Sequence, residues 1–153
     1  MPTDANVLAS VVAAFGDCPR PEHFTDFSHC EECADHDELL QSRDRSTLSI
    51  ADVGNPGWDP VGFCTPQGMA YYMPALARLS LDEPTDEFGW YGSLLVFHLG
   101  PAGNQRQFYE YCSLQQRASI ALLLGHFIES RGSLSDFDVG EIRRALESWG
   151  PSL

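Results

Sequence analysis

The segment from Ser113 to Gly132 constrains the fold most strongly, because only a long helix fits its pattern. Ser113 and Gln116 have the spacing of a capping box at the start of a helix. Apolar residues then recur at intervals of three or four, as on one face of a helix with roughly 3.6 residues per turn; they are Leu114, Ile120, Ala121, Leu123, Leu124, Phe127 and Ile128. Gly132 is the expected stop.

The same periodicity predicts further helices at about residues 5–15, 66–81 and 138–149. We also expect helical structure from 22 to 42, with a break near Ser28 that would make this residue the cap of a helix starting at His29, and a buried helix within 88–99. Almost no segment alternates like a strand. The sequence therefore predicts an all-α fold, a single compact bundle of five to seven helices in one helical domain over residues 1–153.

One long ordered loop is expected at about residues 44–65. Its Asn55–Pro60 segment (NPGWDP) is rich in turn-forming residues, which restrict the backbone. We expect Trp58 to be the buried anchor of this loop, and Asp59 to point toward the cluster described below or to cap the chain from Pro60 onward.

The charge balance limits the partners of the chain. It has 22 acidic and 9 basic residues, all of them Arg, and a formal net charge of −13. Such a surface disfavours nucleic acid and anionic membranes, and it suits a basic protein partner. The sequence has neither a membrane-spanning apolar run nor the pattern of a signal peptide, and five cysteines indicate reduced thiols, so we expect a cytoplasmic protein.

The richest chemistry lies in His29–Glu38 (HCEECADHDE), which holds two thiols, two imidazoles and five carboxylates. On a helix, His29, Cys33 and His36 would share one face and Cys30 an adjoining one. Thiolates and imidazoles favour zinc, so we predict a zinc site of His29, Cys30, Cys33 and His36, completed if needed by a neighbour in the fold. The neighbours considered are His23, His98, His126 and Asp59.

Two other interpretations of this segment stay open. Cys30 and Cys33, with His36, would suit a thiol redox site, since a helix start lowers the pKa of a thiol. The third interpretation is an ordinary solvated helix face with two half-buried cysteines. His98 and His126 lie in apolar stretches and are expected to be core residues. No phosphate loop, nucleophile elbow or zincin motif occurs, which favours a protein that is not an enzyme.

Three motifs carry a resemblance to a family of small bacterial proteins of unknown function: HCEECADHDE, NPGWDP and YYMPAL at residues 71–76. The likeness spans roughly residues 22–131 and implies a single bacterial domain, without an activity. A weaker likeness is to the all-α alkylhydroperoxidase family, whose CxxC is followed by a histidine one residue later than His36. The function hypotheses are an immunity- or inhibitor-like acidic binding protein stapled by zinc, or a regulatory one, and a thiol redox enzyme.

Overall fold

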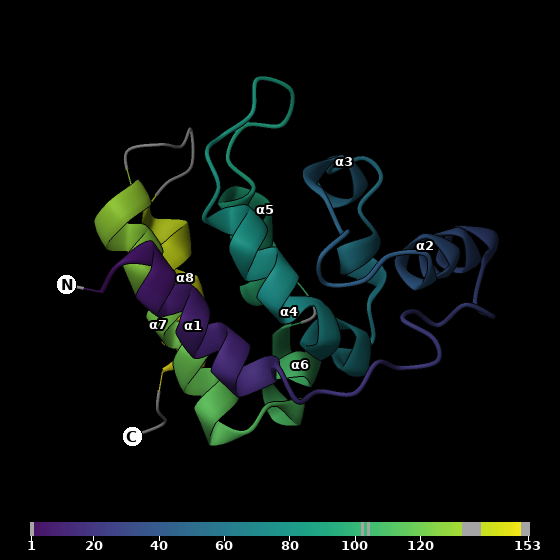
Figure 1. Cartoon of the computed structure of the whole chain (residues 1–153), viewed down its shortest axis with the longest axis horizontal. Coiled ribbons are helices and arrows are strands. Elements are labelled where there is room, and N and C mark those ends of the chain that lie inside the picture. Colours follow the sequence, from purple (N-terminus) through teal and green to yellow (C-terminus); the bar gives the residue numbers. More distant parts are fainter. Residues whose placement is uncertain (1, 102, 104, 133–138, 151–153) are drawn as a thin grey trace.

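The computed structural model describes residues 2–101, 103, 105–132 and 139–150, and it confirms the all-α fold (Figure 1). These residues form eight α-helices and one 3-10 helix, η1, and none of them lies in a β-strand. The elements are α1 (Asp4–Phe15), α2 (Glu31–Gln41), α3 (Ile50–Val53), η1 (Pro60–Phe63), α4 (Pro66–Ser80), α5 (Gly92–Leu99), α6 (Gln105–Tyr111), α7 (Leu114–Arg131) and α8 (Val139–Trp149). The short helices α3 and α6 are additional to the predicted ones, because their few residues leave no periodic pattern in the sequence. None of the described helices has the length and apolar character needed to cross a membrane.

The bundle is centred on α7, which packs between α1 and α8, while α1 also packs on α4 (Figure 1). The predicted helix from Ser113 is confirmed: Ser113 and Gln116 form the capping box, and most of the predicted apolar face is buried. Ala121 and Ile128 are half-buried, and Leu114 is 81% exposed because it lies in the first turn. The start of the last helix was expected at Asp138, which lies outside the described residues; from Val139 onward the helix follows the prediction.

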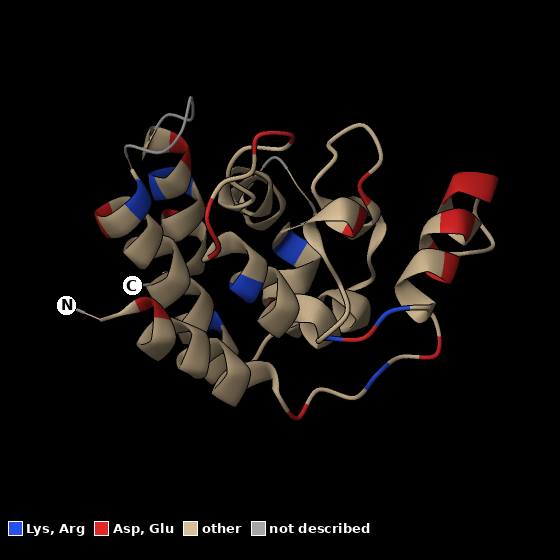
Figure 2. Ribbon diagram, turned by 45° about the horizontal axis from the view of Figure 1, so that its top comes forward, with Lys and Arg blue, Asp and Glu red and all other residues tan. Residues whose placement is uncertain are grey.

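The segment before α2 differs from the prediction. Residues 22–30 are not helical, and the cap of α2 is Cys30 rather than Ser28, so that the helix starts at Glu31. Local apolar spacing at Phe24 and Phe27 resembles a helix, but hydrogen bonds to α2 hold this segment in an extended and turned path. α2 contacts η1 and lies apart from α1, α7 and α8 (Figures 1 and 2).

The expected long loop at 44–65 contains α3 and η1. Asp59 caps η1 by accepting a hydrogen bond from the backbone N–H of Val61, which confirms the capping alternative. The prediction that Trp58 is a buried anchor is wrong, because its side chain is 43% exposed and its ring lies against His36. Proline and glycine fix the backbone of this turn without deciding which side chain faces the core.

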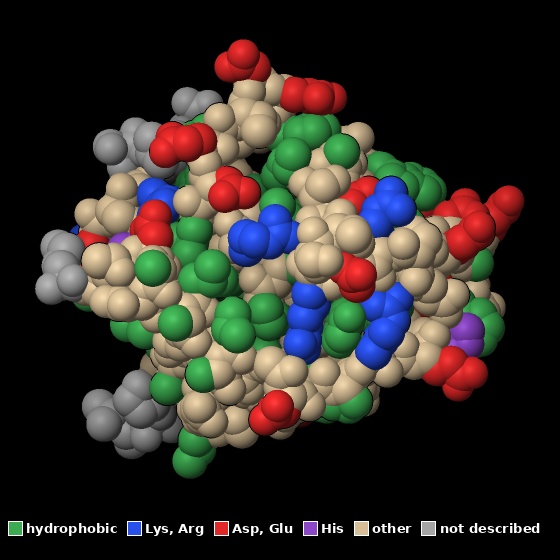
Figure 3. Space-filling view, in the orientation of Figure 1, with side chains coloured by type: hydrophobic (Ala, Val, Ile, Leu, Met, Phe, Trp, Pro, Cys, Tyr) green, Lys and Arg blue, Asp and Glu red, His purple; other side chains and the backbone are tan. Residues whose placement is uncertain are grey.

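Arginines hold the surface segments to the bundle. The Arg45 guanidinium donates to backbone carbonyls of Phe15 and Tyr71 and stacks on the Tyr71 ring at 4.5 Å. Arg20 and Arg78 also donate to backbone carbonyls. Figure 3, in the orientation of Figure 1, shows basic side chains gathered on the face turned toward the viewer. Their hydrogen-bonding capacity serves mainly to connect segments within the molecule.

Candidate metal centre

The candidate site is positioned by the attachment of residues 23–30 to α2. The buried carboxylate of Asp37 accepts hydrogen bonds from the backbone N–H groups of Phe24 at 2.6 Å and Thr25 at 3.3 Å. The Thr25 hydroxyl donates to the carbonyl of Cys33 at 2.7 Å. Because of these contacts the chain runs back along α2, and His29 lies beside the first turn of the helix.

Three of the four predicted ligands come together at this turn. Cys30 Sγ, as the cap of α2, accepts a hydrogen bond from the backbone N–H of Cys33 at 3.2 Å. The two sulfurs are 2.9 Å apart, and His29 Nδ1 is 3.7 Å from Cys33 Sγ. One donor atom from each of His29, Cys30 and Cys33 lies within 4.8 Å of the others, so this group can hold a metal ion.

His36, the fourth predicted ligand, lies outside this group. Its ring is fully buried between Trp58 and Phe63, with centroid distances of 4.3 and 4.6 Å. Its Nε2 is 3.4 Å from a carboxylate oxygen of Glu32. His29 and His36 do not share a helical stripe, because His29 precedes the helix.

The two thiols have different environments. Cys30 is exposed, whereas Cys33 is buried. A hydrogen bond with the Cys33 thiol, helped by the Cys33 backbone N–H and by His29, lowers the pKa of Cys30. The same hydrogen bond, with desolvation, raises the pKa of Cys33 to about 11. Hydrogen bonding with Cys30 and the nearby charges of Cys30 and Asp26 raise the pKa of His29. Cys30 is therefore the thiol that ionises first.

The other histidines considered as ligands each pair with an aspartate. His23 Nδ1 is 2.8 Å from Asp37, and His126 Nε2 is 2.6 Å from Asp4. His98 Nε2 is 2.5 Å from Asp59. His126 is buried, as expected of a core residue, whereas His98 is half-buried and lines the pockets described below. None of these histidines belongs to the His29 group.

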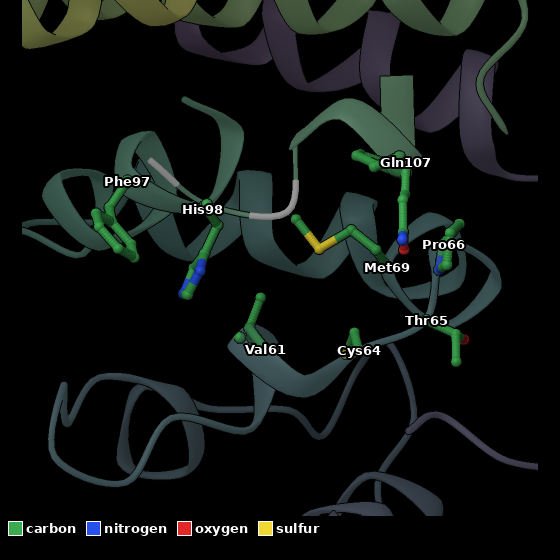
Figure 4. A pocket seen from close by; sticks show the side chains of 11 residues that line it. Val61, Cys64, Thr65, Pro66, Met69, Phe97, His98 and Gln107 are labelled. Carbon is green, nitrogen blue, oxygen red and sulfur yellow. The ribbon is translucent and has the colours of Figure 1, made fainter. Parts of the chain in front are cut away.

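Two pockets flank His98, and the sequence did not indicate either. The Cys64 pocket, of about 220 Å³, lies between η1 and α4 on one side and α5 and α6 on the other; Figure 4 shows Cys64, His98 and Gln107 on its walls. The Glu32 pocket, of about 500 Å³, extends toward α2 and is lined by Glu32, Asp59, Phe63, Leu94, Phe97 and His98 together with three residues of the neighbouring turns. Both pockets depend on contacts between segments distant in sequence.

The cluster supports two kinds of chemistry, metal coordination and thiol exchange, and the pockets supply recesses for a ligand. Nothing in the sequence around the aspartates, apart from their charge, predicted that they would pair with the histidines. Comparisons of the chain with models of protein families, with curated proteins and with solved structures found no match.

Proposed function

We propose that this protein is a small acidic bacterial binding protein, immunity- or inhibitor-like, whose His29, Cys30 and Cys33 bind one zinc ion. The observation that carries the zinc site is the convergence of three donor atoms within 4.8 Å at one helix start. Two sulfurs and one imidazole nitrogen are a typical zinc donor set. Three protein ligands leave one tetrahedral position for water or for a donor from a partner.

The site is local, which gives zinc a structural role. Its ligands span residues 29–33, and this short segment joins the extended chain to α2. A bound ion would fix residues 23–30 against α2 beyond what the Asp37 contacts achieve. Binding to the folded state alone stabilises that state in proportion to the logarithm of the free zinc concentration over Kd.

The first prediction concerns metal content. Protein purified under reducing conditions without chelator should contain about one zinc per chain by elemental analysis, and chelation should lower its melting temperature. Cys30→Ser and Cys33→Ser should each lose the zinc. His36→Phe keeps an aromatic ring between Trp58 and Phe63 but removes the nitrogens, and it should keep the zinc.

Cys18→Ala, which removes a thiol far from the cluster in sequence, is the matched control. A zinc content below about 0.2 per chain in the unmodified protein, with no effect of chelator on melting, would exclude the zinc site. Loss of zinc in His36→Phe would restore His36 to the ligand set.

The partner is proposed to be a basic protein. The net charge of −13 supports this, as do the carboxylates that line the exposed side of α2 (Figure 2). Of the acidic residues in α2, Glu31, Glu32, Asp35 and Glu38 are exposed. Opposite charge accelerates association and selects partners. Five free thiols support a reducing compartment, and we therefore propose a cytoplasmic location.

A second candidate function is thiol–disulfide exchange, favoured by the exposed Cys30 and the buried Cys33 at a helix start. The Cys30 thiolate would attack a substrate disulfide and displace one substrate thiolate. The Cys33 thiolate would then attack Cys30 Sγ in the mixed disulfide and release the second substrate thiol. The pair is thereby oxidised to a disulfide, and the substrate disulfide is reduced to two thiols.

The second prediction tests this candidate on zinc-free protein. Because alkylation follows the thiolate fraction, iodoacetamide should modify Cys30 first, with a pH midpoint below that of an ordinary thiol, and Cys33 only toward pH 11. Peptide mass spectrometry at several pH values measures both rates, with buried Cys112 as the slow reference. A glutathione redox titration should show one reversible two-electron disulfide between Cys30 and Cys33. Equal alkylation rates at the two residues, or no reversible disulfide, would remove this candidate.

A further inference from the structure

The Glu32 pocket combines negative charge with aromatic walls. Glu32 stands at its rim, and its side chain is 46% exposed. Asp59 is buried in the floor, where one carboxylate oxygen accepts from the backbone N–H of Val61 and the other pairs with His98. Neither Lys nor Arg occurs among the residues that line this pocket. His98 is the basic side chain among these residues and it pairs with Asp59, so no Lys or Arg of the wall competes for the carboxylate of Glu32.

Two phenylalanines form the accessible apolar walls. Phe63 is 38% exposed and Phe97 is 50% exposed, and both residues line the Glu32 pocket. Phe63 also packs against His36, whose Nε2 faces Glu32. The carboxylate of Glu32 is thus held next to an aromatic surface by a buried histidine.

This combination is selective for a cation that also has a flat apolar face. An aromatic ring attracts a cation above its face, and a guanidinium group can stack there while it donates hydrogen bonds to a carboxylate. An ammonium group offers the charge without the flat face. A simple metal cation would have to lose tightly bound water before it could contact the phenylalanines, so they would contribute little to its binding.

We infer that the Glu32 pocket receives an arginine side chain of the basic protein partner, with its guanidinium between Phe97 and the carboxylate of Glu32. The inference rests on the proposed acidic binding function, and it names the point of contact. Charge complementarity selects the occupant, because the protein has a net charge of −13 and neither Lys nor Arg lines the pocket. His36, absent from the metal group, has the role of positioning Glu32.

The test uses the full chain labelled with nitrogen-15 and two capped amino acids, N-acetyl-arginine amide and N-acetyl-citrulline amide. Citrulline has nearly the same shape as arginine but lacks the charge. We expect arginine to shift amide signals of residues around the pocket, including Gly62 and Phe97, with a Kd on the order of 1 mM, as a few exposed cation contacts allow. Citrulline should cause no comparable shifts.

Paired variants separate the pocket from general acidity. Glu32→Gln and Phe97→Ala should each raise the Kd for arginine by about threefold or more. Glu38→Gln removes an exposed carboxylate from the same helix, and Tyr111→Ala removes an aromatic ring that is 40% exposed elsewhere; both should leave the Kd unchanged. The exposed positions of Glu32 and Phe97 favour retention of the fold, which the amide spectra verify directly.

Several outcomes would overturn the inference. They are equal shifts with citrulline, shifts mapping to the acidic loop at 82–87, and an unchanged Kd in both pocket variants. A glycine–serine peptide with one central arginine distinguishes a partner's side chain from a free small cation: binding of the capped residue without binding of the peptide would contradict the partner assignment. The zinc measurement is independent, since zinc-loaded and zinc-free protein should both bind arginine.

Discussion

Most of the histidines in this protein pair with an aspartate, and this pairing decides which of them remains available as a metal ligand. His23, His98 and His126 each lie within hydrogen-bond distance of an aspartate oxygen, and His36 is enclosed by two aromatic rings. His29 is the exposed imidazole that remains beside the two cysteines. The small size of the metal group follows from this distribution, because the other imidazoles already have partners or are enclosed.

The third prediction compares two tryptophans. Trp149 is 2% exposed and its indole N–H donates to the carbonyl of Leu99, so Trp149→Ala should lower the free energy of unfolding by about 3–5 kcal/mol. Trp58 is 43% exposed, and Trp58→Ala should cost about 1 kcal/mol, chiefly through lost contact with His36. Urea unfolding with a common slope measures both. Equal losses would mean that the Asn55–Pro60 turn is as much a part of the core as α8.

At the scale of elements, caps were predictable and long-range attachment was not. Thr65 followed by Pro66 marks the start of α4, and the Ser113 capping box marks that of α7; both signals are local. The extended path of residues 22–30 depends on Asp37, which satisfies backbone groups more than ten positions earlier. No local pattern contains that contact. The spacing of Cys30 and Cys33 is local, and their sulfurs do lie together. His36 was placed with them by assuming one helix from His29, whereas the structure encloses it between Trp58 and Phe63.

The fourth prediction concerns the junction of α1 with α7. Asp4 accepts hydrogen bonds from Arg131 and pairs with His126, and these contacts hold its pKa well below the ordinary value. Because the folded pKa is the lower one, the stabilisation is present above the unfolded pKa of about 4 and declines as the pH falls below it. Asp4→Asn should cost about 1 kcal/mol at pH 7, a value reduced for the half-exposed carboxylate, and less at pH 3.

Unfolding curves at several pH values measure this difference. Asp82→Asn, at an exposed position of the 82–87 loop, serves as the control and should behave like the unmodified protein. A loss that stays constant from pH 7 to pH 3 would contradict the assigned role of the Asp4 carboxylate.

At the scale of the whole molecule, negative charge is spread over a surface whose basic groups are largely engaged. The chain has no lysine, and several arginines donate to backbone carbonyls at the ends of helices and turns. The excess of carboxylates over arginines therefore gives the solvent-facing surface a negative potential that few positive charges offset. This arrangement favours encounter with basic partners and also causes self-repulsion.

The fifth prediction follows from that self-repulsion. Raising sodium chloride from about 10 to about 200 mM shortens the Debye length and should raise the melting temperature by a few degrees. Calorimetry measures the shift, and sucrose at matched osmolality is the uncharged control. A fall in melting temperature with salt would mean that attractive ion pairs such as Asp4 with Arg131 outweigh the repulsion.

The arginine contacts also decide where a protease can cut. Trypsin cleaves after lysine and arginine, and this chain offers it arginine alone. The bond after Arg45 can enter a protease active site only when the loop has left α4, since the Arg45 side chain is hydrogen-bonded to Tyr71 and to the end of α1. The side chain of Arg106 is 90% exposed, and it pairs with the carboxylate of Glu110, one turn away in the same helix, rather than with a distant segment. The order of tryptic cleavage in the native protein therefore reports the local opening of each segment.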